Sequence, residues 1–95
     1  MEQRILGGTG RPVSVVGLGT WQLGNDWGDV SERAAAGLLD ASAASGVTMI
    51  DTADVYGDGR SETLIGAWLA QQPHARRPLV ATKMGRRLAQ VPENY

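Results

Sequence analysis

Three short apolar runs, separated by two stretches with helical periodicity, constrain the fold of this 95-residue chain more than any other feature. The runs occupy residues 15–19, 47–50 and 79–82, and the helical stretches occupy residues 31–45 and 61–71. The runs are too short for helices and are rich in residues that favour strands. Alternation of strands and helices predicts parallel strands joined by right-handed helical crossovers. The expected fold class is therefore α/β.

Start and stop signals support both predicted helices. Asp29 or Ser31 can cap the first helix, and Gly46 suits its left-handed end. Ser61 can cap the second helix. Each helix also carries apolar residues at helical spacing: Ala35, Leu38, Leu39 and Ala43 in the first, and Leu64, Ile65, Trp68 and Leu69 in the second. We expect these side chains, Trp68 included, to form the core.

The segment before the first run predicts a small β-hairpin. Two extended stretches within residues 3–16 flank residues 7–12, which are dense in turn-forming glycine and proline. The N-terminus lacks the apolar core of a signal peptide, and no apolar run approaches the roughly 20 residues of a membrane span. We therefore expect a cytoplasmic protein.

Composition excludes several classes of function. The chain has no cysteine, so a disulfide framework, a thiol nucleophile and cysteine-ligated metal sites are ruled out. Its formal net charge is −1, so no overall field attracts nucleic acid or an anionic membrane. We expect no metal site and no nucleic-acid or membrane partner.

The most informative polar residues are Asp51, Tyr56 and Lys83. Asp51 and Lys83 each end an apolar run, and Tyr56 lies in the loop that follows Asp51. Because the carboxyl ends of parallel strands meet at one edge of a sheet, the three side chains can converge. A lysine ammonium favours a nearby phenolate, so such a tyrosine could donate a proton to a substrate. The alternatives are that Asp51 only opens a turn, or that Tyr56 is a surface residue beside an unrelated ion pair.

Gly17-Leu18-Gly19 after the first run raises a second hypothesis, a dinucleotide site of the Rossmann type. That fingerprint requires a third glycine at position 22, which is Gln22 here. It also requires a helix to begin at once, whereas turn-forming residues follow instead. The spacing therefore argues against a Rossmann site.

Three separated motifs resemble the aldo/keto reductase family. They are residues 17–21 (GLGTW), residues 51–57 (DTADVYG) followed by Ser61-Glu62, and residues 81–85 (ATKMG). The resemblance implies a (β/α)8 barrel that reduces aldehydes and ketones with NADPH. It also implies that Tyr56 is the general acid and that Asp51 and Lys83 form the pair that tunes it.

The same resemblance implies a cofactor site and a substrate pocket. Cofactor-binding residues would be Gly19, Thr20, Trp21, Asp51 and Lys83. The pocket for a small-molecule carbonyl substrate would be lined by Trp21 and Tyr56, and Trp27 could extend its aromatic wall.

The chain is short for this family, since such barrels need roughly 250 residues. We expect residues 1–95 to be the N-terminal part of one barrel domain, comprising the hairpin, the first three parallel strands and two connecting helices. The family's fourth-strand histidine is missing, and His74 cannot replace it because it precedes Lys83. The isolated chain is therefore expected to be inactive. The alternative is a non-catalytic interaction or assembly module that could self-associate through unpaired strand edges.

Overall fold

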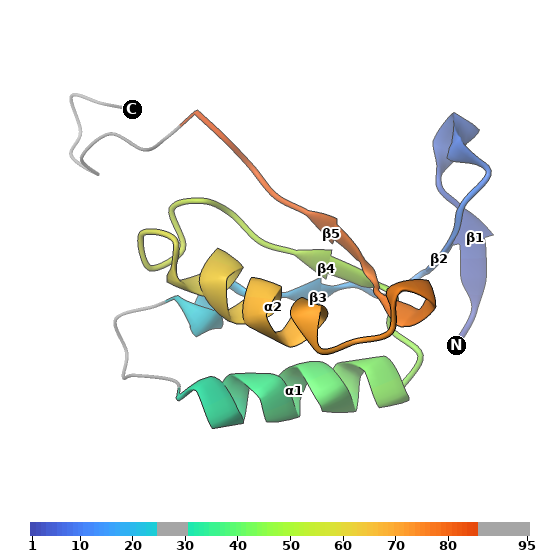
Figure 1. The fold of residues 1–95 in the computed structure, drawn as a ribbon. Helices are drawn as coiled ribbons and strands as arrows, with labels where there is room; N and C mark the ends of the chain where they lie inside the picture. Colours follow the sequence, from blue (N-terminus) through green and yellow to red (C-terminus); the bar gives the residue numbers. More distant parts are fainter. Residues whose placement is uncertain (25–30, 86–95) are drawn as a thin grey trace.

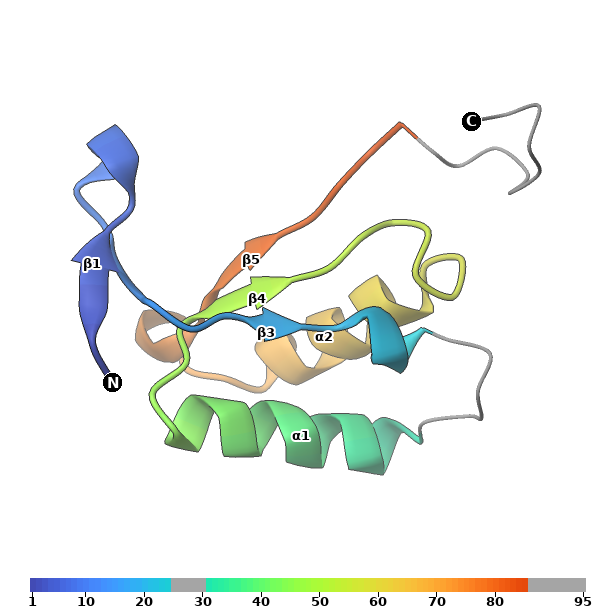
Figure 2. The same cartoon turned by 180° about the vertical axis from the view of Figure 1, so that it is seen from behind.

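The structure is a computed structural model that describes residues 1–24 and 31–85. It contains a hairpin, a three-stranded parallel sheet and two helices that lie on one face of that sheet (Figures 1 and 2). The hairpin pairs β1 (Gln3–Ile5) with β2 (Pro12–Ser14) in antiparallel fashion. The sheet has the order β3-β4-β5, with β3 at Leu18–Gly19, β4 at Met49–Asp51 and β5 at Leu79–Ala81. The helices are α1 (Glu32–Ala44) and α2 (Arg60–Ala70), and single 3-10 turns occupy Gly7–Thr9, Trp21–Leu23 and His74–Arg76.

The register of the parallel strands places an apolar row of residues next to a row that contains Asp51. Ile50 is opposite Leu18 on one side and Val80 on the other, and all three pack in the core beneath the helices. The next row places Asp51 between Gly19 and Ala81. Because successive strand residues point to opposite faces, Asp51 points away from the helices. The sheet thus offers a carboxylate, flanked by two small residues, on its open face.

The core lies between the sheet and the two helices, as the helical periodicity predicted. Its buried members are Leu23, Ala35, Leu39, Ile50, Leu64, Ile65 and Trp68. The indole N–H of Trp68 donates a 2.8 Å hydrogen bond to Asp40, so this side chain joins α2 to α1. The prediction of Trp68 as core packing is confirmed, whereas Ala43 is exposed and does not belong to the inner face of α1.

The ends of α1 match the sequence signals. The hydroxyl of Ser31 accepts a hydrogen bond from the backbone N–H of Ala34, so Ser31 is the N-cap. Gly46 follows the helix in the left-handed conformation, with φ of +90°. Asp29, the other candidate cap, lies outside the described residues.

The predicted cap of α2 was wrong by two residues, because the helix begins directly after a turn with positive φ values. Gly57, Asp58 and Gly59 all have positive φ, at 64°, 52° and 96°. This turn makes Gly59 the N-cap and lets the helix begin at Arg60. Ser61 therefore does not cap the helix and lies inside its first turn, fully buried.

The first strand is shorter than predicted. Val15 and Val16 are 46% and 52% exposed and make no ladder, which begins only at Leu18. The chain just before them is held by side chains instead. The N–H of Ser14 donates to Thr48 Oγ1 at 2.8 Å, and the N–H of Thr48 donates to Ser14 Oγ at 2.9 Å. These reciprocal bonds join the hairpin to the start of β4.

The other two strands are also displaced slightly from their predicted bounds. The second was expected at residues 47–50 and includes Asp51 as its last residue, while the third ends at Ala81 rather than at residue 82. Within residues 1–24 and 31–85, neither helix is long and apolar enough to cross a membrane.

Two glycines bring separate loops into backbone contact. A Cβ atom at Gly24 would collide with the carbonyl carbon and oxygen of Tyr56, and a Cβ at Gly57 would collide with the carbonyl oxygen of Gly24. The colliding atoms belong to the backbone, so they cannot move aside cheaply. The turn after β3 therefore fixes the loop that carries Tyr56.

We expect Gly24→Ala to lower the free energy of unfolding by about 1–3 kcal/mol, because it overpacks this contact. The matched control is Gly66→Ala in α2, where an added Cβ meets nothing within 4 Å. This control should raise the same free energy by about 0.5–1 kcal/mol, because glycine is a poor helix former. Urea denaturation of the protein measures both. A Gly24→Ala variant as stable as Gly66→Ala would show that the two loops do not touch.

Candidate active site

Asp51 and Lys83 form a salt bridge at the carboxyl edge of the sheet. Nζ of Lys83 lies 3.2 Å from Oδ2 and 3.3 Å from Oδ1 of Asp51. Asp51 ends β4, and Lys83 stands two residues beyond the end of β5. Both side chains are about half exposed, at 54% and 53%. The pair is therefore held by neighbouring strands and remains open to a ligand.

The same ammonium also contacts the loop after β4. Nζ of Lys83 donates to the carbonyl oxygen of Thr52 at 2.8 Å and to the phenolic oxygen of Tyr56 at 3.5 Å. It lies 5.2 Å from the centroid of the tyrosine ring, which is within the range of a cation–π contact. The structure thus brings together the three residues that the sequence singled out.

The surroundings of Lys83 keep it charged. Desolvation by itself lowers the pKa of Lys83, but the hydrogen bonds and charges of Asp51 and Tyr56 outweigh it. The pKa of Lys83 therefore lies above its ordinary value. A permanent positive charge beside the phenolic oxygen stabilises the negative charge that this oxygen acquires when it releases its proton. The site can consequently act as a general acid.

The residues of the turn after β3 differ in what they present to this edge. Gly19 ends β3 with open space where a side chain would be, and Trp21 is half exposed. Thr20, in contrast, is fully buried and donates both its hydroxyl and its N–H to the carbonyl oxygen of Asp51. Gly19 and Trp21 can meet a ligand here, while contact of a cofactor with Thr20 stays a prediction. Trp27 lies outside the described residues.

Sequence reasoning missed the residues that support this site from below. Oε2 of Glu62 accepts a 2.7 Å hydrogen bond from the hydroxyl of Thr82, the residue before Lys83. Ser61, expected to be a cap, binds the hydroxyl groups of Thr20 and Thr52 instead. The adjacent Ser61-Glu62 pair was visible in the sequence, but its partners follow the ends of three different strands.

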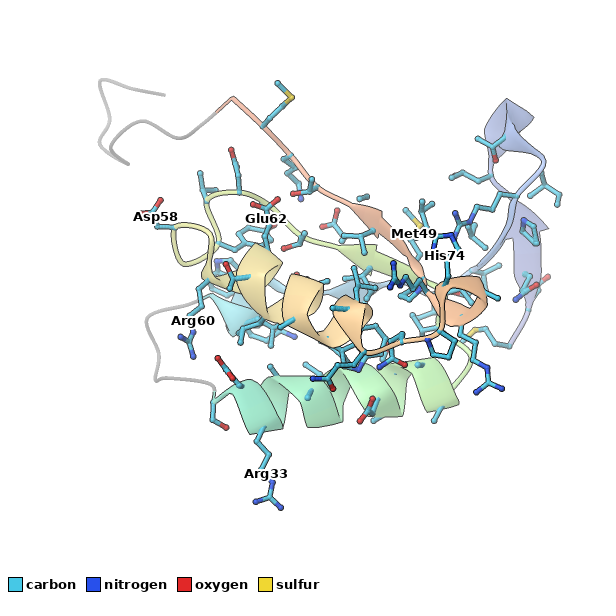
Figure 3. The ribbon with its side chains drawn as sticks, viewed as in Figure 1. Arg33, Met49, Asp58, Arg60, Glu62 and His74 are labelled. Carbon is cyan, nitrogen blue, oxygen red and sulfur yellow. The ribbon has the colours of Figure 1, made fainter. Side chains whose placement is uncertain are left out.

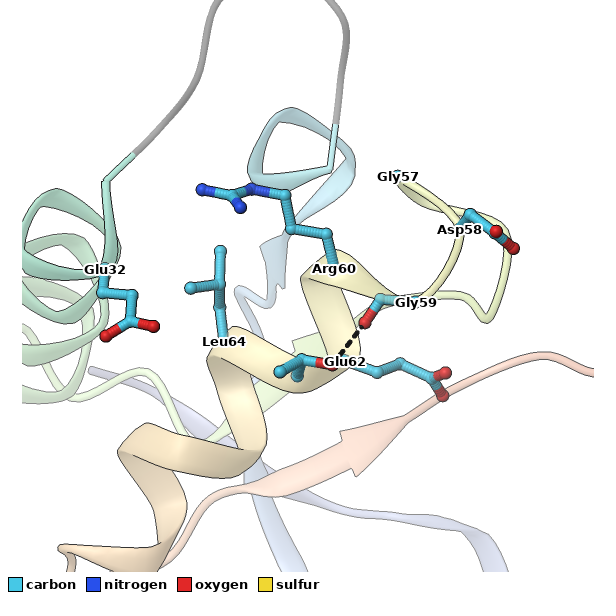
Figure 4. Close-up of a pocket in the computed structure, with 8 residues that line it drawn as sticks. Glu32, Gly57, Asp58, Gly59, Arg60, Glu62 and Leu64 are labelled. Carbon is cyan, nitrogen blue, oxygen red and sulfur yellow. Dashed lines mark hydrogen bonds between the residues drawn. The ribbon is translucent and has the colours of Figure 1, made fainter.

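Arg60 and Glu62 leave the first turn of α2 in opposite directions (Figures 3 and 4). Arg60 lines a hollow of about 650 Å³ near the start of α1, with Glu32, Leu64 and the loop at Gly57–Gly59. The hollow is lined by none of Asp51, Tyr56 and Lys83. The Asp51–Lys83 ion pair and the phenolic hydroxyl of Tyr56 lie together at the edge of the sheet instead.

No metal site accompanies these residues in the part of the chain that the structure describes. No three side chains among its one histidine, its aspartates and its glutamates come close enough to share an ion. His74, labelled in Figure 3, lies in the exposed turn before β5, at the opposite end of that strand from Lys83. The described edge presents a phenol, an ammonium and a carboxylate.

Comparison with known proteins shows the family to which the chain belongs. The sequence model of the aldo/keto reductase family matches residues 15–95. The chain belongs to the aldo/keto reductase family. Among curated relatives, pyridoxal 4-dehydrogenase of Microbacterium luteolum is 44% identical over 85 residues, covering 90% of this chain and 24% of that protein. Aryl-alcohol dehydrogenase [NADP(+)] of Phanerodontia chrysosporium is 36% identical over 87 residues, covering 86% of this chain and 23% of that protein.

Solved aldo/keto reductases confirm the predicted fold class. One from Pseudomonas aeruginosa superimposes with a TM-score of 0.78 at 38% identity, covering 93% of this chain and 33% of that structure. The holo form of a Bacillus halodurans enzyme superimposes with a TM-score of 0.75 at 33% identity, covering 98% of this chain and 29% of that structure. These neighbours are (β/α)8 barrels. The chain thus spans from 23% to 33% of the length of these four relatives.

The charge of Lys83 can be tested directly, because it is the only lysine among the 95 residues. Its pKa should lie above the ordinary value of about 10.4 and should fall in Asp51→Asn, which removes its carboxylate partner. Since the pKa is higher in the folded state, the ion pair stabilises the fold below about pH 10.4, and this contribution is lost as the pH rises through the folded-state value.

The measurement is an NMR titration of the lysine Nζ, with the signal assigned by its loss in Lys83→Arg. Glu2→Gln is the control, because this carboxylate pairs with Arg4 in the hairpin. An Asp51→Asn variant with an unchanged Lys83 pKa would show that the two side chains do not interact in solution.

Proposed function

We propose that the protein containing this chain reduces aldehydes and ketones to alcohols with NADPH, and that Tyr56 is the general acid. The observation that carries the proposal is the position of the Lys83 ammonium, 3.5 Å from the phenolic oxygen and paired with Asp51. An isolated surface tyrosine would have no such partner. Family membership supports the class of reaction, and the matched Phanerodontia relative is named for NADP(+).

The described residues fit a nicotinamide cofactor at the carboxyl edge of the sheet. Gly19 and Ala81 flank Asp51 in one strand row, so no bulky side chain from that row covers the carboxylate. The exposed indole of Trp21 offers an aromatic wall near the end of β3. When bound, the cofactor would supply the hydride that reaches the carbonyl carbon of the substrate.

The protein's own part is to manage the charge on the substrate oxygen. As the carbonyl carbon accepts hydride, negative charge develops on the oxygen, and the O–H of Tyr56 donates its proton there. The Lys83 ammonium then faces a phenolate, which it binds more strongly than the neutral phenol. Asp51 holds the ammonium in place and balances its charge between turnovers. The substrate class that follows is small molecules with an aldehyde or ketone group.

The test is Tyr56→Phe in the whole-barrel protein, meaning this chain together with the remainder of its barrel. The substitution keeps the ring beside Lys83 and removes only the proton donor. We expect the turnover number for carbonyl reduction to fall by roughly 10²- to 10⁴-fold, the usual contribution of a general acid. Absorbance of NADPH at steady state measures turnover.

The control is the affinity of the same variant for NADPH, measured by cofactor fluorescence. It should remain within about twofold of the unsubstituted protein, because Tyr56 is assigned to the substrate and not to the cofactor. Turnover that survives in Tyr56→Phe would remove this residue from the mechanism. Loss of turnover together with loss of NADPH binding would show a structural role instead.

A further inference from the structure

Three buried hydroxyl groups meet directly beneath the site. Thr20 follows β3, Thr52 follows β4, and Ser61 lies in the first turn of α2, with exposures of 0%, 1% and 0%. Buried polar groups need hydrogen-bond partners, and each of these hydroxyls has them. The cluster therefore joins the ends of two strands to the start of a helix.

The distances define an order of hydrogen bonds that uses every hydroxyl proton. Each hydroxyl can donate once. Thr20 donates to the carbonyl oxygen of Asp51 at 2.8 Å, which leaves its oxygen free to accept from Ser61 at 3.0 Å. The hydroxyl of Ser61 also lies 3.2 Å from the carbonyl oxygen of Thr20, so with its proton directed at Thr20 its oxygen accepts from Thr52 at 2.8 Å. Ser61 is the central member, because it accepts from one threonine and donates to the other.

Ser61 is also connected to each of the three residues of the site. Its backbone N–H donates to the carbonyl oxygen of Tyr56 at 3.2 Å. Through its hydroxyl it holds Thr52, whose carbonyl oxygen accepts from Lys83 at 2.8 Å, and Thr20, which binds the carbonyl oxygen of Asp51. A buried residue with no exposed atom thus fixes the backbone of the catalytic loop against the strand ends.

We propose that Ser61 is a positioning residue that sets the separation between the phenolic oxygen of Tyr56 and Nζ of Lys83. This inference rests on the proposed function of Tyr56 as a general acid. Without the Ser61 hydroxyl, Thr52 loses its acceptor and Thr20 loses its donor, so the strand ends and the loop can shift relative to one another. Catalysis is sensitive to small shifts of the reacting groups, since a displacement of about 1 Å can lower the rate about 100-fold.

The experiment compares Ser61→Ala and Thr52→Val with Thr63→Ala in the whole-barrel protein. Thr63 is in the same helical turn, but its exposed hydroxyl donates to the carbonyl oxygen of Gly59 at 2.8 Å, four residues earlier in the chain. We expect kcat for carbonyl reduction to fall about 10- to 100-fold in Ser61→Ala, and by a smaller factor in Thr52→Val. kcat should fall by a larger factor than NADPH affinity in both variants, and Thr63→Ala should keep the full kcat.

A double-mutant cycle with Tyr56→Phe separates positioning from simple destabilisation. If Ser61 acts through the phenol, Ser61→Ala will have no further effect on the residual turnover of Tyr56→Phe. An equal fold-loss in both backgrounds would overturn the proposal, and so would an unchanged kcat in Ser61→Ala.

Thr52→Val keeps the shape of the side chain. If Ser61→Ala fails to fold, Thr52→Val can replace it in the double-mutant cycle with Tyr56→Phe. An unchanged kcat in Thr52→Val, or an equal fold-loss in both backgrounds, would likewise overturn the proposal. If Tyr56→Phe itself retains turnover, the proposed function fails rather than this inference alone.

Discussion

Burial of one apolar row beneath two helices holds the three parallel strands in register. Leu18, Ile50 and Val80 form that row, and the helices cover it from one side. Because the strands run in the same direction, their carboxyl ends lie side by side. The next residue of β4 is Asp51, and the chain beyond β5 reaches Lys83. The hydrophobic register of the sheet thus determines that a carboxylate and an ammonium meet at one edge.

Much of this could be predicted from the sequence, because the governing signals are local. The alternation of apolar runs and helical stretches specified the strands, the helices and their parallel order. Ser31 and Gly46 marked the ends of α1 through chemistry that does not depend on distant residues. Parallel geometry alone then predicted that Asp51 and Lys83 would come together.

The parts that escaped prediction depend on contacts between distant segments. Serine is a residue type that often caps helices. In this chain, however, the three consecutive positive φ values at residues 57–59 place the helix start before Ser61, and its hydroxyl points inward. The contact between Gly24 and Gly57 involves backbone atoms of two loops, so no side-chain pattern could indicate it. Val15 and Val16 have the character of a buried strand but precede the point at which the ladder begins.

The ammonium of Lys83 is placed where it can follow the charge that develops on the phenolic oxygen of Tyr56 in the proposed reaction. A lysine has three protons, and Nζ of Lys83 faces four oxygen atoms, of which the phenolic oxygen of Tyr56 is the farthest. Its closest partner is the carbonyl oxygen of Thr52, a neutral acceptor. In the proposed reaction, a phenolate would compete for the ammonium far better than the phenol does, because its interaction becomes one between two full charges. Stabilisation that grows as the proton leaves is what lowers a reaction barrier, whereas equal binding of both forms would not.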